Sequence, residues 1–253
     1  MRIAVCIKQV PTRDWQPRVD ESGTWVREQD ASYEMNEPDA YALEEALRLK
    51  ERLGGEVIVC SAGPPRVAQL LREALARGAD RAIHVLDDRL AAADAFVVSA
   101  ALAEALRGET VDLVLTGLQS DDLGSAQTGV ILGERLGFAH ATIIMEVEPA
   151  DGGLRVKREL EGGWFQWLTL PTPAVLTIQS GINQLRYATL KGIMAAKKKE
   201  IRTMDAPALP EARLRITRLY PPEKGTRTEI LSGGAADAAR TLIERLRNEA
   251  RVI

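Results

Sequence analysis

The sequence has few aromatic residues, only two cysteines and no long uninterrupted apolar run. Aromatic side chains make up 4% of the 253 residues, so the core must be built mainly from aliphatic side chains. The cysteines, Cys6 and Cys60, both lie inside apolar segments, which favours small core residues over a disulfide or a metal site. No apolar run reaches the roughly 18 residues of a membrane-spanning helix, so none is expected.

The balance of charges is nearly even. Lys and Arg number 33 and Asp and Glu number 36, which gives a formal net charge of −3. A dedicated nucleic-acid-binding protein usually carries a basic excess, so this class is disfavoured. The first residues lead directly into an apolar run without the layout of a signal peptide, so we expect a cytoplasmic protein.

Several catalytic and phosphate-binding motifs are also missing. No Gly-x-Gly-x-x-Gly segment follows a predicted strand, and there is no Walker A sequence. His84 and His140 have no partner at metal-ligand spacing, and no Ser/His/Asp or Cys/His set is visible. Residues 232–237 hint at the pyrophosphate loop of ATP-dependent ligases, but without a preceding strand they are better interpreted as a helix start. The sequence therefore offers no acid, base or nucleophile.

Apolar strand-like runs alternate with segments of helical periodicity through most of the chain. We expect strands at residues 3–7, 56–61, 81–86, 111–116 and 142–147, and helices at residues 40–53, 67–77, 91–106 and 127–136. This alternation is typical of βαβ units and predicts an α/β fold with a mostly parallel, doubly wound sheet. Asn36 is expected to cap the first helix, with Pro38 in its first turn.

A different pattern begins after residue 148. Residues 154–160 and 164–170 alternate with period two and predict an antiparallel hairpin, in which Trp164 and Trp167 are expected to be packing residues. Residues 174–178 are expected to form a strand that returns to the sheet.

The C-terminal part is expected to be an extended arm. We assign residues 1–200 to a nucleotide-binding α/β domain and residues 201–253 to the arm, which is rich in proline and charge and ends in an amphipathic helix at 236–252. The arm has too little local core to stand alone, so we expect it to pack on another subunit.

Residues 117–129 form the strongest candidate site. They connect a predicted buried strand to a predicted helix, and the N–H groups of such a loop and helix start favour an anion. The loop also carries polar side chains suited to reading a ribose or a base, namely Gln119, Ser120, Asp121, Asp122, Ser125, Gln127 and Thr128. By spacing alone, an ordinary turn capped by Ser125 or Asp122 fits equally well.

The expected topology places further segments near this loop. Ligands of parallel sheets bind beyond the carboxyl ends of the strands, near a switch in strand order. Residues 6–9 and 61–64 follow two predicted strands, and residues 36–39 begin a helix that can face the same crevice. This convergence favours a nucleotide cradle over an ordinary turn.

Residues 183–199 combine apolar side chains of exposed appearance with a run of lysines. A lysine run is usually a solvated face. Apolar anchors beside positive charge also suit docking to an acidic partner surface.

Several segments together resemble the β subunit of electron transfer flavoprotein. They are residues 5–11, 35–39, 42–50, 77–85, 112–119, 127–129 and 183–190. The resemblance covers residues 3–199 clearly and the arm loosely, and its most specific part is the Asn-x-x-Arg-Tyr-Ala-Thr-Leu segment at 183–190.

The resemblance implies a heterodimer. An α subunit would hold most of a redox-active FAD, while the β subunit would contribute a wall near the flavin and bury one AMP as a structural ligand. Carried over by position, the AMP contacts would be Cys6, Asn36, Glu37, Pro38, Asp39, Ala62, Gly117, Leu118, Gln119, Ser120, Asp121, Asp122, Leu123, Gly124, Ser125, Ala126, Gln127 and Thr128.

The resemblance also implies partners. Leu190 would anchor a recognition loop, with Ile193 and Met194, for acyl-CoA dehydrogenases or similar flavoenzymes as donors, and a quinone oxidoreductase would accept the electrons. The arm would embrace the α subunit. The chain would thus be an electron carrier subunit without catalytic residues of its own. Lys191 and Gly192 follow the anchor where the family has proline.

Two departures in the loop leave the ligand open. Ala126 replaces the Asn of the common form and Gly124 replaces an acidic residue, and an Ala-Gln pair also occurs in electron-bifurcating relatives, where a second FAD replaces AMP. Both ligands share an adenosine monophosphate part. A stand-alone adenine-nucleotide sensor is disfavoured by the unsupported arm, and an ATP-using ligase or hydrolase by the missing phosphate-transfer motifs.

Overall fold

The computed structural model describes residues 1–222 and 228–253, so residues 223–227 of the expected arm lie outside the described part. The described residues form two compact units, Met1–Thr217 and Arg218–Ile253. No helix among them is long and apolar enough to cross a membrane.

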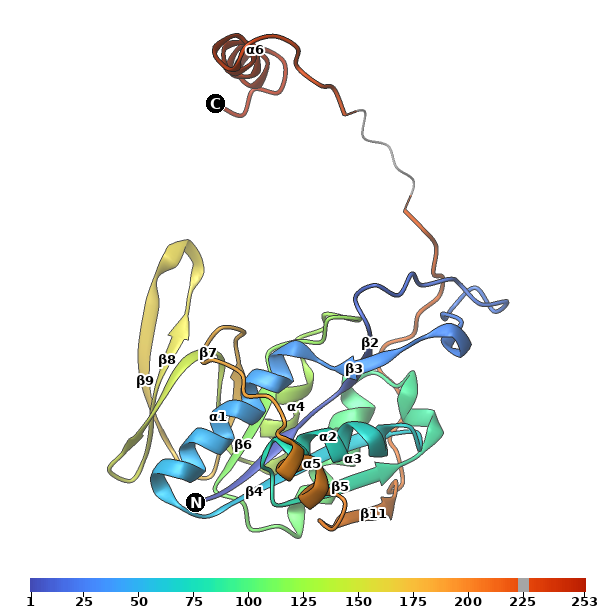
Figure 1. Ribbon diagram of the computed structural model, residues 1–253, viewed down its shortest axis with the longest axis vertical. Helices are drawn as coiled ribbons and strands as arrows, with labels where there is room; N and C mark the ends of the chain where they lie inside the picture. Colours follow the sequence, from blue (N-terminus) through green and yellow to red (C-terminus); the bar gives the residue numbers. More distant parts are fainter. Residues whose placement is uncertain (223–227) are drawn as a thin grey trace. The chain divides into compact units, whose positions relative to one another are not determined.

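The first unit is built on a nine-stranded sheet (Figure 1). In spatial order its strands are β11 (Ile201–Asp205), β5 (Arg81–Leu86), β4 (Glu56–Gly63), β1 (Arg2–Cys6), β6 (Leu113–Gly117), β10 (Ala174–Ile178), β7 (Ala139–Ala150), β8 (Gly153–Glu159) and β9 (Phe165–Pro171). The strands from β11 to β7 are parallel, and β8 and β9 are antiparallel. The mostly parallel α/β sheet and the return of residues 174–178 to it are confirmed.

Helices cover both faces of the parallel part. They are α1 (Glu37–Leu53), α2 (Val67–Arg77), α3 (Ala95–Arg107), α4 (Thr128–Leu136) and α5 (Leu190–Ala196). The apolar sides of α1 and α2 share one core with one face of the sheet, while α3 and Leu132 of α4 belong to the core on the other face. Since both faces are buried, the strands read as continuous apolar runs.

The strand order reverses beside β1. From β1 the chain goes to β4 and β5 on one side, and then returns to β6 and later β10 on the other side. The connections that leave the carboxyl ends of β1 and β6 therefore diverge, which opens a crevice at this switch point.

Some elements differ from the sequence prediction. Short strands β2 (Gln9–Pro11) and β3 (Tyr33–Met35) form a separate two-stranded sheet, and a single antiparallel bridge joins Val19 and Val26. Helix α3 begins at Ala95 rather than at residue 91, because the Asp94 side chain accepts the N–H of Val97 at 2.9 Å and so caps it there. Residues Glu28–Asp30, Asp88–Ala91 and Glu161–Gly163 form 3-10 turns.

The boundary of the first unit also differs from the expected one. Strand β11 pairs with β5 and extends the sheet at residues expected to begin the arm. The following segment is held on α3, where Asp94 accepts the N–H groups of Arg213 and Leu214 at 2.6 and 2.8 Å. The compact unit therefore continues to Thr217 instead of ending at residue 200.

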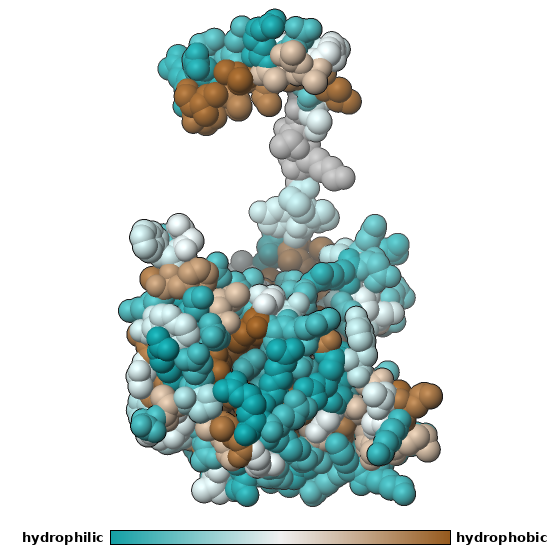
Figure 2. Space-filling model, turned by 60° about the vertical axis from the view of Figure 1, so that its left-hand side comes forward, coloured by the Kyte–Doolittle hydropathy of each residue, from teal (hydrophilic) through white to brown (hydrophobic). Residues whose placement is uncertain are grey.

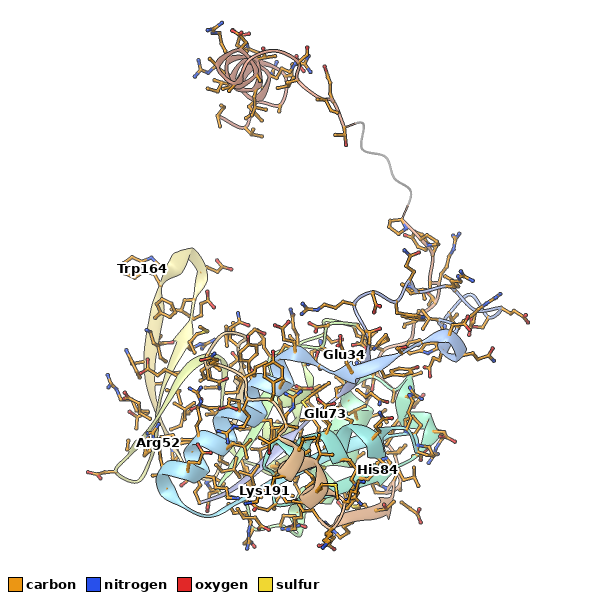
Figure 3. The ribbon with its side chains drawn as sticks, viewed as in Figure 1. Glu34, Arg52, Glu73, His84, Trp164 and Lys191 are labelled. Atoms are coloured by element: carbon orange, nitrogen blue, oxygen red, sulfur yellow. The ribbon has the colours of Figure 1, made fainter. Side chains whose placement is uncertain are left out.

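The antiparallel hairpin of β8 and β9 is confirmed, but the prediction for its tryptophans is wrong. Trp164 is 74% exposed and Trp167 is 39% exposed. Figure 3 shows Trp164 at the tip of the hairpin, directed away from the sheet. The hairpin extends beyond the helices that cover the parallel strands, so no helix within the described part of the first unit covers these rings.

The second unit contains α6 (Ala235–Asn248), which is shorter than the expected helix at 236–252. Its apolar side carries Leu242 and Ile243, both about half exposed. Apolar side chains gather along one side of this helix in Figure 2.

Candidate functional site

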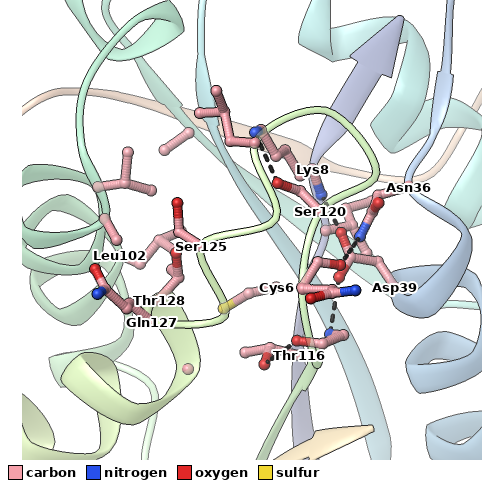
Figure 4. A pocket seen from close by; sticks show the side chains of 18 of the residues that line it. Cys6, Lys8, Asn36, Asp39, Leu102, Thr116, Ser120, Ser125, Gln127 and Thr128 are labelled. Atoms are coloured by element: carbon pink, nitrogen blue, oxygen red, sulfur yellow. Dashed lines mark hydrogen bonds between the residues drawn. The ribbon is translucent and has the colours of Figure 1, made fainter. Parts of the chain in front are cut away.

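An open pocket lies at the carboxyl ends of β1 and β6, at the switch in strand order (Figure 4). It encloses about 880 Å³ of space outside the atoms, part of it open to solvent. Cys6 and Lys8 come from the end of β1, Ala62 from the end of β4, and Gly117 begins the loop from β6. The sequence prediction of converging strand ends is therefore correct.

Asn36 holds the loop after β6. Its Nδ2 donates to the carbonyl of Gln119 at 2.9 Å, and its Oδ1 accepts the N–H of Asp121 at 2.9 Å. Asn36 occupies the N-cap position of α1, but its side chain makes no cap hydrogen bond among the described residues. The predicted capping role is thus wrong, because both polar atoms of this side chain serve the loop.

Asp39 joins the ends of two strands. Its Oδ2 accepts the N–H of Lys8 at 2.7 Å and its Oδ1 accepts the N–H of Gly117 at 2.8 Å. The side chain is almost fully buried. Burial raises the pKa of Asp39 to about 7, against the opposing effect of the two N–H donors, Asn36 and the Lys8 ammonium.

Lys8 is paired within the site. Its ammonium donates to both carboxylate oxygens of Asp122 at 2.6 and 2.8 Å and to the Ser120 hydroxyl at 3.2 Å. Burial acts to raise the pKa of Asp122, but the charge and hydrogen bond of Lys8, together with hydrogen bonds from Ser120 and the Leu123 N–H, hold this pKa below its usual value. Because this cation is neutralised, an anionic ligand depends chiefly on backbone N–H groups.

Helix α4 supplies those groups. No described side chain caps its start at Gln127, so the first N–H groups keep their hydrogen-bonding capacity. A Cβ on Gly129 would overlap the side chains of Thr116 and Thr177, which shows how closely the helix start lies on the sheet. The expected capping of this helix by Ser125 or Asp122 is wrong, because no described side chain caps α4 and Asp122 binds Lys8 instead.

One apolar wall of the pocket was not predicted. It is formed by Leu90, Ala91, Ala93, Ala95, Val98 and Leu102, from the segment after β5 and the first turns of α3. The small alanines leave space for a flat ligand. Ligands of parallel sheets lie beyond the carboxyl ends of the strands. If this rule is applied also to the strand at 81–86, it predicts that the segment after this strand lines the pocket.

The pocket brings together most of the predicted contacts. Those that line it are Cys6, Asn36, Asp39, Ala62, Gly117, Leu118, Gln119, Ser120, Leu123, Ser125, Ala126, Gln127 and Thr128. Glu37 and Asp121 instead form ion pairs with Arg13, and Asp122 pairs with Lys8. Pro38 packs beneath Gly117, and Gly124 turns the loop with a φ of +61°.

The predicted docking residues lie elsewhere, on α5. Leu190, Ile193 and Met194 are 84%, 44% and 62% exposed. The helix rests on α2, where a Cβ on Gly192 would overlap the carbonyl oxygen of Ala76. The segment before α5 is fixed by Arg186, whose guanidinium donates to Glu44 at 2.7 Å and to Glu51 at 2.6 Å. Figure 3 marks Lys191 on this helix.

Within the described ranges, no group of three or more His, Cys, Asp or Glu residues is arranged to hold a metal ion. His84 is buried in β5, and its Nε2 lies 3.0 Å from the carbonyl oxygen of Gly63. Cys6 and Cys60 are both free and buried, and Cys6 also borders the pocket.

Comparison with known proteins gives the family. The family described as "Electron transfer flavoprotein domain" matches residues 24–209. The chain belongs to this electron transfer flavoprotein family. A similar protein is the electron transfer flavoprotein subunit beta of Methylophilus methylotrophus, which is 38% identical over 96% of this chain and 97% of its own length.

Other relatives show how varied the electron transfer flavoprotein family is. Subunit CarD of the caffeyl-CoA reductase-Etf complex of Acetobacterium woodii is 34% identical over 98% of this chain and 99% of its own. Protein FixA of Azotobacter vinelandii is 36% identical over 81% of this chain and 75% of its own. The chain is thus of the β-subunit type in a family of electron carriers, and the family resemblance seen in the sequence is confirmed.

Proposed function

We propose that this chain is the β subunit of a heterodimeric electron transfer flavoprotein. It binds one AMP in the pocket at the switch point as a structural ligand, and it helps to shield the FAD held by the α subunit. It also docks an electron-donating flavoenzyme of the acyl-CoA dehydrogenase type. A quinone oxidoreductase then takes the electrons.

The pocket is the observation that supports AMP most directly. AMP has three chemically distinct parts, and the lining has a matching feature for each. The uncapped start of α4 suits a phosphate, the wall of Leu90 to Leu102 suits a purine, and Asp39 with the polar loop suits ribose hydroxyls. Since Lys8 is neutralised by Asp122, the positive potential is that of a helix start, which suits a single phosphate.

The flavin supplies the redox chemistry when it is bound by the complex, and the protein supplies binding and position. In this chain, Asn36 and Asp39 fix the loop after β6, and this loop fixes the approach to α4. The chain therefore acts as a scaffold and a shield, and we assign it no acid, base or nucleophile.

The α5 surface supports the docking role. Leu190 and Met194 project from a short helix that is held rigidly by α2 and by the Arg186 ion pairs. Lys191, Lys197 and Lys198 lie in or beside the same helix and favour an acidic partner surface. Exposed apolar anchors surrounded by charge suit a transient partner that must bind and leave.

The second unit supports the association with an α subunit. In α6 the apolar side of Leu242 and Ile243 is half exposed, and the described part of this unit offers no second layer to cover it. An amphipathic helix gains stability chiefly by burying such a side. We infer that the α subunit provides the missing surface.

A β subunit with a second FAD in place of AMP is the alternative. Two observations favour it: Ala126 lies in the loop where the common form has Asn, and one relative is a subunit of a caffeyl-CoA reductase-Etf complex. The pocket is open on one side, so it does not exclude a longer ligand that shares the adenosine monophosphate part.

Counting the nucleotides released from the purified two-subunit complex separates these possibilities. One FAD and one AMP per heterodimer support the proposal, two FAD and no AMP select the alternative, and no adenine nucleotide beyond one FAD refutes both. Ser125→Asp, which adds a negative charge beside the α4 start, should empty the pocket of AMP and retain FAD. Ser232→Asp in the second unit is the matched control.

A further inference from the structure

The hairpin of β8 and β9 concentrates aromatic side chains in a chain that has few. Leu160, Trp164, Phe165 and Trp167 are 39%, 74%, 47% and 39% exposed, and we call these four residues the hairpin patch. Aromatic residues make up only 4% of the sequence, so three exposed rings within four residues are unusual. Exposed clusters of this kind mark interaction surfaces.

Cations hold two of these rings in place. The Arg155 guanidinium carbon lies 4.0 Å from the centroid of the Trp167 ring, and the Lys157 ammonium lies 4.4 Å from that of Phe165. Arg155 is itself fixed by Glu148, with a separation of 3.2 Å between guanidinium nitrogen and carboxylate oxygen. The patch is therefore ordered before any partner arrives, which lowers the entropic cost of binding.

Strand β9 is the outer strand of the sheet beyond β8. An edge strand presents unpaired N–H and C=O groups, and with exposed aromatic side chains it is prone to unwanted association. Five of the seven residues from Phe165 to Pro171 are exposed, and the other two, Leu168 and Leu170, are half-buried. A permanently bound partner would remove this liability.

We propose that the hairpin patch is a contact surface for the flavin-bearing α subunit. The inference rests on the heterodimer of the proposed function and adds the place on this chain where the α subunit binds. It does not depend on whether the pocket holds AMP or a second FAD.

The position of the patch distinguishes the α subunit from the electron donor. The hairpin patch belongs to the β9 end of the sheet, whereas α5 rests on α2, which packs on β4 and β5 near the β11 end (Figure 1). Two exposed apolar surfaces at opposite ends of one sheet serve two partners. The α5 surface is small and bordered by lysines, which suits the transient electron donor. We therefore assign the hairpin patch to the permanently bound α subunit.

The size of the patch argues against a second copy of this chain. With about 150–250 Å² for each aromatic side chain, the exposed part of the patch is roughly 400 Å². Two such patches facing each other bury about 800 Å², below the roughly 1,200 Å² of a stable interface. A second copy is therefore disfavoured, and the α subunit of the proposed heterodimer is the partner that we assign to the patch.

Charge defines the complementary surface on the partner. Lys157 forms no ion pair with any described carboxylate, and together with Arg155 it gives the aromatic face a positive rim. We therefore expect the α subunit to present an apolar depression with one or more carboxylates beside it.

Co-purification of the full chain with its FAD-loaded cognate α subunit tests the proposal. Trp164→Asp and the double variant Trp164→Asp/Phe165→Asp should weaken the complex at least about tenfold, as expected when a central aromatic contact is lost. Leu190→Asp is the matched control, since it places the same charge on the α5 surface, and it should leave the complex intact. Far-ultraviolet circular dichroism and thermal midpoints establish that each variant is folded.

Hydrogen exchange on the wild-type complex provides the second measurement. Amides of β9 should become protected when the α subunit binds, while those of the opposite edge strand, β11, should not. The hairpin proposal is overturned, while the heterodimer stands, if the wild-type complex forms but the hairpin variants bind the α subunit as well as the wild type does and the amides of β9 gain no protection. If the wild type forms no complex with the α subunit, the proposed function fails as well. Self-association through β9 in place of the complex would assign the patch to a second copy.

Discussion

Asp39 and Gly117 fix each other at the floor of the pocket. The Asp39 carboxylate accepts the Gly117 N–H at 2.8 Å, and a Cβ on residue 117 would overlap that same carboxylate oxygen and the Pro38 ring. The start of α1 and the end of β6 therefore approach each other as closely as the backbone permits. This contact sets where the loop of residues 117–129 begins.

Replacing Gly117 by Ala should separate these two elements. Overpacking of a buried contact costs about 1–3 kcal/mol in the free energy of unfolding. We expect this loss in urea denaturation, together with reduced retention of AMP. Gly108→Ala is the control, because a Cβ there meets nothing within 4 Å and its φ of −80° suits any residue. Equal behaviour of the two variants would contradict the close contact.

Asp39→Asn should change how stability depends on pH. The pKa of Asp39 in the folded protein is about 7, above the ordinary 3.8, because burial disfavours the charged form. The folded state thus holds this proton more tightly, so the free energy of unfolding falls as the pH rises from about 4 to about 7. Asn does not titrate and lacks this contribution.

The free energy of unfolding of the wild-type protein should therefore fall relative to that of Asp39→Asn across that window. Above about pH 8 the difference between the two free energies should be constant. The variant should be less stable near pH 5, since its amide nitrogen faces a backbone N–H and leaves it unpaired at a cost of about 1–3 kcal/mol. Urea unfolding from pH 4.5 to 8.5 measures both. Parallel curves over the whole range would show that Asp39 does not titrate there.

Ala126 offers a stabilising substitution. Its φ of +52° lies in the left-handed region, where a side chain other than Gly, Asn or Asp is strained. Ala126→Asn should raise the free energy of unfolding by about 0.5–1 kcal/mol, and Ala126→Val should lower it by about 1–2 kcal/mol. Thermal unfolding of Ala126→Asn, the wild type and Ala126→Val measures both effects. If their stability does not decrease in this order, the loop changes conformation in the variants.

Leu190→Ala should weaken docking of the electron donor. Leu190 is 84% exposed on α5, so its removal should not disturb the fold or the flavin content. We expect slower electron transfer from an acyl-CoA dehydrogenase, by about tenfold when an anchoring contact is lost. Stopped-flow flavin absorbance gives the rate, and Leu53→Ala, another exposed leucine, is the control. Unchanged transfer in Leu190→Ala would remove the docking assignment.

Much of the fold follows from local pattern in the sequence. The strands of the parallel part are continuous apolar runs because both faces are buried, and α1 and α2 end at Gly54 and Gly78, directly after the predicted ranges 40–53 and 67–77. Strand β11 was missed because Ile201–Asp205 is a short edge strand with polar residues exposed to solvent.

The site was only partly predictable for a different reason. The loop of residues 117–129 is recognisable because its glycines and polar side chains are adjacent in sequence. The wall from Leu90 to Leu102 and the role of Asn36 depend on contacts between distant segments, for which local spacing has no signal. Likewise, the tryptophans of the hairpin look like core residues in sequence, because the pattern does not reveal that no helix covers them.

Photolabelling with 8-azidoadenosine monophosphate tests the central claim most directly, namely that the pocket at the ends of β1 and β6 holds an adenosine monophosphate moiety. The nucleotide-stripped two-subunit complex is labelled, digested and mapped by mass spectrometry, with excess AMP as competitor. The account predicts AMP-protected labelling confined to residues 90–102, 117–129 and the end of β1. Labelling elsewhere on the chain, or labelling of these peptides that AMP does not suppress, would contradict it.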